Sequence, residues 1–216
     1  MPTEETLRGL PNIESLRQKT RALAALDAIM SRDWKYRYFL FNAAWDTGEM
    51  MATITNGSGD EVFLLFTQAG AILKGFDHES FMSPWAREEK TLWTGLFTSV
   101  PDEFRDFLTE PAFDIDNSTF CAWRRSSDNS WHSDEIEYPD ANGNADGSDW
   151  LLQEYVEGHS CYVDFCKDYY EREVPLVTVQ AFYDFKQLDQ EMLDALNPGL
   201  HLDEIRAEML EIGYPI

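Results

Sequence analysis

The stretch DHES, from Asp77 to Ser80, brings together residue types that could do acid–base chemistry. His78 titrates near neutral pH, and a neighbouring carboxylate can orient its imidazole as a general base. Asp77 and Glu79 flank the histidine, and Ser80 carries a hydroxyl that such a base can activate. This combination predicts a small hydrolase-like enzyme, with its site near His78 where a strand ends, as one function for the chain.

The spacing within DHES argues against a self-contained catalytic group. If the stretch continues a strand, Asp77 and Glu79 share one face and His78 points to the other. A working dyad then needs a carboxylate from elsewhere in the chain. Polar clusters after a strand are also typical of turns and helix N-caps, so a catalytic and a purely structural interpretation both stay open.

A second polar stretch, DANGNADGSDWLLQE, partly matches a calcium-binding loop. Asn142, Asn144 and Asp146 place oxygen ligands at every second position, and Gly147 takes the sixth. The match then fails, because Gln153 occupies the twelfth position, where such loops need a bidentate Glu. We therefore expect neither a metal nor another cofactor here, and we interpret the stretch as a solvated turn before a helix.

The three cysteines, Cys121, Cys161 and Cys166, indicate a reducing compartment, because so small and odd a number does not build a disulfide framework. Cys161 and Cys166 would lie about 140° apart around a helix, which does not suit a tetrahedral zinc site with His159. No apolar run approaches the roughly 20 residues that span a bilayer, and the N-terminus lacks a secretory signal. The sequence therefore predicts a cytoplasmic protein without membrane contact.

Net charge is the strongest compositional feature of this 216-residue chain. Lys and Arg number 17 and Asp and Glu number 40, giving a formal net charge of −23. Residues 1–100 carry 10 basic and 13 acidic side chains, whereas residues 101–216 carry 7 basic and 27 acidic ones. Such a field repels nucleic acid and attracts basic partners, although acidic surfaces also simply keep proteins soluble.

The acidic residues of the second half recur at helical spacing. Asp164, Asp168 and Glu171 fall on one face of a predicted helix, and Glu204 and Glu208 lie one turn apart on a later helix. Charge runs usually mark a solvated face, yet like charges at this spacing cost about 0.2–0.5 kcal/mol per pair. An acidic binding or regulatory protein with a basic protein partner is therefore the first functional hypothesis, and an immunity-type inhibitor of a toxin is its specific form.

The elements that position these residues begin with a helix and a sheet. Residues 12–31 show an apolar face at helical spacing. Apolar and aromatic runs across residues 34–76 predict an antiparallel meander of four strands, with a tight turn at Asn56 to Asp60 and another turn from Ala43. A later strand is expected near residues 118–125.

The remainder of the chain is predicted to be mainly helical. A short helix is expected over residues 101–110, and further helices follow from residue 149 to the C-terminus. We found no internal repeat and no long linker. The sequence therefore predicts a single α+β domain over residues 1–216, with an N-terminal helix, an antiparallel sheet and a helical C-terminal half. It predicts no particular oligomeric state.

Several stretches resemble those of a family of uncharacterised bacterial proteins. They are NGSGD, KGFDHES and MSP in the first half, and EPAF and FCAWRR further on. The resemblance covers most of the chain and implies a bacterial origin and a shared fold. It implies no activity, so it assigns no site residue.

Overall fold

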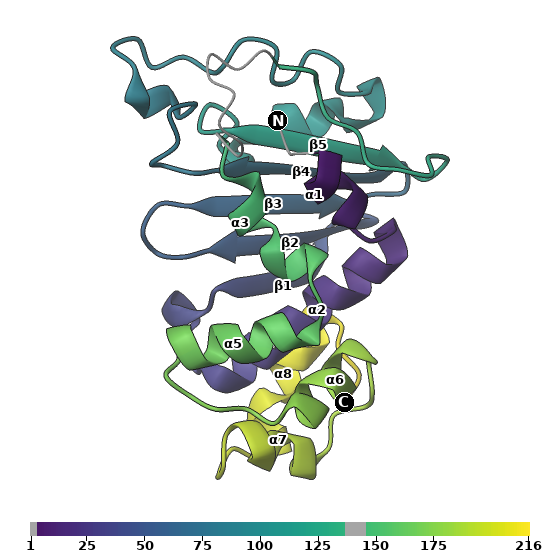
Figure 1. The fold of residues 1–216 in the computed structure, drawn as a ribbon. Coiled ribbons are helices and arrows are strands. Elements are labelled where there is room, and N and C mark those ends of the chain that lie inside the picture. Colours follow the sequence, from purple (N-terminus) through teal and green to yellow (C-terminus); the bar gives the residue numbers. More distant parts are fainter. Residues whose placement is uncertain (1–3, 137–145) are drawn as a thin grey trace.

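The sheet is an antiparallel meander in which spatial order follows chain order (Figure 1). The computed structural model describes residues 4–136 and 146–216. The strands are β1 (Phe39–Asp46), β2 (Glu49–Thr55), β3 (Glu61–Phe66), β4 (Gly70–Phe76) and β5 (Phe120–Arg125). The predicted α+β class, with the meander and the later fifth strand, is confirmed.

Helices precede the sheet, cover it and follow it. The α-helices are α1 (Glu4–Gly9), α2 (Ile13–Met30), α3 (Ser148–Leu151), α4 (Gln153–Val156), α5 (His159–Tyr169), α6 (Leu176–Tyr183), α7 (Gln190–Leu196) and α8 (Leu202–Ile212). The 3₁₀ helices are η1 (Trp34–Tyr36), η2 (Pro84–Ala86), η3 (Asp102–Leu108) and η4 (Pro111–Phe113). Within the described ranges, no helix combines the length and apolarity needed to span a membrane.

The main core lies between α2 and one face of the sheet. Asn12 caps α2, because its side chain accepts a hydrogen bond from the Ser15 N–H. Leu16, Leu23 and Leu26 are fully buried in the cluster that contains the inward side chains of the strands. Figure 1 shows α5 to α8 gathered beyond β1, at the opposite end of the sheet from the N-terminus.

The segment between β4 and β5 covers part of the second face of the sheet. Phe107 and Phe113 stack there at 4.5 Å between ring centroids and belong to the cluster that contains Ile72. The fully buried Lys74 reaches the same segment, because its Nζ donates to the Asn117 carbonyl at 2.8 Å. The 3₁₀ helix η3 stands where the sequence predicted a short helix over residues 101–110, and η4 follows it.

The predicted start of the first strand is wrong. Trp34 to Tyr36 form η1, because the Asp33 side chain accepts a hydrogen bond from the Lys35 N–H at 3.1 Å and turns the chain. The strand begins only at Phe39. The alternating aromatic residues fit a strand and this turn equally well, so the sequence pattern did not show where the strand begins.

Two further predicted boundaries also move. The turn expected from Ala43 comes only at Thr47 and Gly48, where Gly48 takes a φ of 78°. The helix expected from residue 149 breaks at Leu152, which separates α3 from α4. The helix α1 was not expected from the sequence.

The carboxylate of Asp27, which is fully buried, joins α2 to both β1 and α5. Its Oδ2 accepts hydrogen bonds from the N–H groups of Tyr38 at 2.7 Å and Phe39 at 2.8 Å. Its Oδ1 accepts one from the Tyr162 hydroxyl at 2.7 Å. Burial raises the pKa of Asp27 to about 6, although these donors favour the charged form. The side chain therefore fixes the residue at which β1 begins.

Replacing Asp27 by Ala should lower the free energy of unfolding by at least about 3 kcal/mol, because three buried donors lose their acceptor. Asp27→Asn should cost less, since its amide keeps one acceptor oxygen and gains an N–H that the Tyr162 oxygen can accept. Urea unfolding followed by circular dichroism measures both losses. Equal losses for Ala and Asn would contradict the role assigned to the hydrogen bonds.

Stability should fall as pH rises between about pH 4 and pH 7. Burial raises the pKa of Glu154 to about 7, as it raises that of Asp27 to about 6, so the folded chain keeps protons that the unfolded chain releases. Free energies of unfolding measured at several pH values test this. Asp27→Asn and Glu154→Gln should each flatten the decline, and a wild-type stability that increases over this interval would refute the assignment.

Candidate functional site

The DHES stretch forms a turn at the end of β4. The Asp77 Oδ1 accepts hydrogen bonds from the N–H groups of Glu79 at 3.0 Å and Ser80 at 3.2 Å. The Ser80 Oγ accepts a hydrogen bond from the Met82 N–H at 3.0 Å. The strand-like alternation of Asp77 and Glu79 against His78 is therefore wrong, because these residues have already left the sheet.

Asp60 is the carboxylate that pairs with His78. Its Oδ1 lies 2.7 Å from the imidazole Nδ1 and accepts the His78 N–H at 2.8 Å, while its Oδ2 accepts from the Asn56 side chain at 2.5 Å. Asp60 is 4% exposed, whereas 41% of the His78 side chain is exposed. The His78 Nε2 lies 4.0 Å from the Glu79 carboxylate. A buried acid thus orients an accessible imidazole.

Sequence reasoning treated Asp60 only as a turn residue and missed this pairing. The signal was present, because β3 and β4 are antiparallel and Glu61 lies opposite Phe76. The residue before β3 must then face the residues that follow β4. An expected meander therefore predicts that Asp60 and His78 are neighbours.

The two partners shift one another's pKa in the directions expected of an ion pair. The hydrogen bond that the His78 ring donates to Asp60 raises the pKa of His78, and the charges of Asp60, Glu79 and Asp77 act in the same direction. Burial opposes ionisation of Asp60, but the hydrogen bonds from His78 and Asn56 outweigh it and lower the pKa of Asp60. The arrangement favours a protonated His78 beside an ionised Asp60.

Asp77 also contacts the beginning of α3. Its Oδ2 accepts a hydrogen bond from the Trp150 indole N–H at 3.2 Å. Gly147 packs against it so closely that an added Cβ would lie 2.4 Å from the Asp77 Cβ, and its φ of 82° also favours glycine. The site therefore rests on three separate parts of the chain.

Donor atoms of Asp60, Asp77 and His78 all lie within 4.8 Å of one another. One imidazole and two carboxylates form a set that suits ions such as Zn²⁺ or Mn²⁺. The sequence had placed no metal here. The His78 Nδ1 already lies 2.7 Å from the Asp60 Oδ1, so in the arrangement as it stands these two groups form an ion pair and do not both point at a common ion.

The calcium-like stretch separates into two parts. Asn142 and Asn144 lie outside the residues that the structure describes. Asp146 is buried, and its Oδ1 accepts a hydrogen bond from the Ser148 N–H at 3.0 Å, while its carbonyl accepts one from the Thr119 hydroxyl at 2.7 Å. These contacts support the start of α3, so a turn does precede this helix, but at Asp146 and Ser148 it is buried and not solvated as expected.

The acidic residues predicted to meet a partner fall into two groups. Asp164, Asp168 and Glu171 are exposed and form no ion pair in the described part of the chain. Glu204 caps its own helix by accepting the His201 N–H at 2.9 Å. Glu208 pairs with Arg32 and, at 2.6 Å, with Arg37. Glu208 therefore holds α8 in place and is not a free surface charge.

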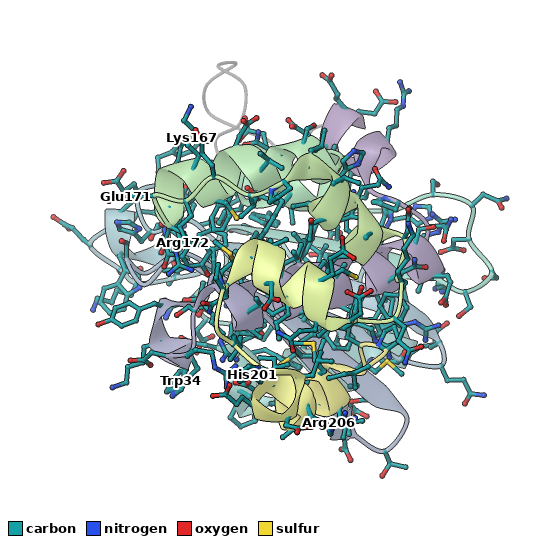
Figure 2. The ribbon with its side chains drawn as sticks, turned by 90° about the horizontal axis from the view of Figure 1, so that it is seen from below. Trp34, Lys167, Glu171, Arg172, His201 and Arg206 are labelled. Carbon is teal, nitrogen blue, oxygen red and sulfur yellow. The ribbon has the colours of Figure 1, made fainter. Side chains whose placement is uncertain are left out.

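Three exposed aromatic residues accompany Asp164, Asp168 and Glu171, and we call these three aromatic residues the aromatic surface. Trp34 and Tyr36 of η1 are 65% and 64% exposed, and Tyr169 at the end of α5 is 39% exposed. The Tyr170 hydroxyl donates to the Tyr36 carbonyl at 3.3 Å, which holds η1 against the end of α5. In Figure 2, Trp34 and Glu171 extend outward on the same side of the molecule.

A groove of about 400 Å³ begins beside Trp34 and follows the outer edge of β1. Consecutive residues Phe39 to Asn42 line it, and α8 forms the opposite wall. The lining residues are Ala24, Trp34, Arg37, Phe39, Leu40, Phe41, Asn42, Met51, Thr53, Glu208, Glu211 and Ile212. Sequence reasoning missed this groove, because it depends on where α8 meets a strand more than 150 residues earlier.

Replacing Asp60 by Asn should lower the pKa of His78 toward its ordinary value, because the charged hydrogen-bond acceptor is lost. Asp77→Asn, which removes a more distant charge, should lower it less. NMR titration of the His78 ring protons measures both shifts. An unchanged His78 pKa in Asp60→Asn would contradict the coupling.

Comparison with protein-family models, with curated proteins and with solved structures gives no significant match. The resemblance to uncharacterised bacterial proteins therefore stays an expectation. The geometry of the described residues is what any assignment of function to this chain must rest on.

Proposed function

We propose that this protein binds a basic protein partner through the aromatic surface and the acids beside it. The observation that carries the proposal is the combination of exposed Trp34, Tyr36 and Tyr169 with the exposed Asp168 and Glu171. The surrounding helical end is strongly acidic, since residues 159–216 carry 12 acidic and 4 basic side chains.

Aromatic side chains and carboxylates contribute differently to such an interface. Aromatic side chains supply large contact areas at little entropic cost, and they are enriched among the residues that dominate binding energy. Their ring faces also attract the cationic groups of Lys and Arg. Unpaired carboxylates attract a basic partner from a distance and so speed association. An immunity-type inhibitor that covers a basic toxin is the specific form of this proposal, by analogy.

A second candidate is a hydrolase-like enzyme, and the Asp60–His78 pair is the observation that favours it. The buried Asp60 fixes one imidazole nitrogen at 2.7 Å and leaves the ring accessible. A water molecule is the nucleophile that such a base would activate. We rank this candidate second, because His78 lies on an exposed turn and the hydrogen bond to Asp60 raises its pKa, which favours the protonated ring that cannot act as a base.

The binding proposal is tested with the purified chain as bait at low and moderate salt. We expect a basic protein whose association slows with ionic strength, since the Debye length falls from about 30 Å at 0.01 M to about 8 Å at 0.15 M salt. Trp34→Ala with Tyr36→Ala should speed dissociation. Asp168→Lys with Glu171→Lys should slow association about tenfold.

Matched controls show whether binding depends on this surface, on the overall negative charge or on His78. Glu88→Lys with Glu89→Lys adds the same charge at exposed positions outside the helical end and should have a much smaller effect. His78→Ala should leave binding unchanged. A partner or an activity that is insensitive to salt and to the acid reversals, yet abolished by His78→Ala, would overturn the binding proposal in favour of the enzyme.

A further inference from the structure

The outer edge of β1 carries backbone groups that the sheet does not use. The Thr55 N–H donates to the Tyr38 carbonyl at 2.9 Å, and the register places Leu40 and Asn42 in the same orientation toward β2. In an antiparallel pair the intervening residue points its N–H and C=O the other way. The N–H and C=O of Phe41 therefore face away from β2.

These groups open into the groove beside β1. Phe41 lines the groove, and outside the β1–β2 ladder no hydrogen bond among residues 4–136 and 146–216 engages its N–H or C=O. Asp27 accepts the N–H of Phe39 at 2.8 Å, whereas Phe41, which is 5% exposed, has no such acceptor among the described residues. Exposed strand edges are templates for pairing, which proteins usually cover or charge.

The walls of the groove define what else an occupant must satisfy. Trp34 offers a ring face at one end, and Ile212 adds apolar surface from α8. Glu208 is neutralised by Arg32 and Arg37, whereas the exposed Glu211 forms no ion pair with any residue that the structure describes. The four residues Phe39 to Asn42 span about 13 Å as a strand, which is the length of a short extended peptide.

We infer that this groove binds an extended segment of the partner, which pairs with β1 as an additional strand. The inference rests on the proposed binding function and specifies how the partner is held. Backbone hydrogen bonds to Phe41 supply affinity, an aromatic or apolar side chain of the segment packs on Trp34, and a Lys or Arg side chain meets Glu211. A helix cannot pair with Phe41 in this way, because the backbone groups of a helix already bond within the helix.

Hydrogen exchange of the free protein provides the first measurement. The Phe41 amide should exchange faster than the amides of Leu40 and Asn42, which are paired to β2. If Phe41 is as well protected as they are, the edge is already closed and the inference is wrong. Protection that grows with protein concentration would show instead that two copies pair through β1, which also overturns it.

A displayed library of random 12-residue peptides, selected against the full chain, provides the probe. Selected peptides should slow exchange at Phe41, and their binding should weaken about tenfold or more in Trp34→Ala but not in Leu210→Ala, an exposed position on α8 outside the groove. The selected peptides can also be N-methylated at one backbone position at a time, while the protein stays unchanged. Methylation at alternate peptide positions should abolish binding, and methylation at the positions between them should be tolerated.

The outcomes distinguish this inference from the proposed function. Neutral peptides that show the alternating N-methyl pattern would support strand pairing even if no basic partner exists. Basic peptides that bind without the pattern, or without slowing exchange at Phe41, would overturn strand pairing and leave the basic partner standing. A library that yields no peptide dependent on Trp34 also overturns the inference.

Discussion

The carboxylate of Asp27 is the contact on which the β1 end of the molecule depends. It lies in the first long helix, accepts the N–H groups at which the first strand begins, and holds a hydroxyl from α5. A single buried side chain thus sets the relative position of α2, β1 and α5. The aromatic surface and the groove are built on those elements, so both depend on a group that contacts no partner.

Local pattern was enough to predict the sheet. Alternating apolar runs and the glycine-containing turn at Asn56 to Asp60 define a meander, because each strand pairs with the next one in the chain. The start of β1 could not be predicted in this way. It is decided by Asp27, a side chain from another element, whereas the residues from Trp34 onward carry an equally good strand pattern.

The two candidate sites also differ in whether the sequence could predict them. The pairing of Asp60 with His78 follows from antiparallel neighbours, so the sequence contained the information even though the prediction overlooked it. The groove has no such local signal. Glu208 looked like one of many surface acids, but its ion pairs with Arg32 and Arg37 bring α8 to the edge of β1 and create the wall opposite that strand.

The order in which the chain emerges during synthesis affects how long the edge of β1 lacks a neighbouring element. The sheet is complete at β5, which ends at Arg125, while the helix that stands beside β1 begins only at Leu202. A nascent chain can therefore display a paired sheet whose β1 edge lacks its α8 wall. Edges of this kind are where unfinished chains associate with one another. The late arrival of α8 would then narrow access to β1 and protect the newly made protein from aggregation.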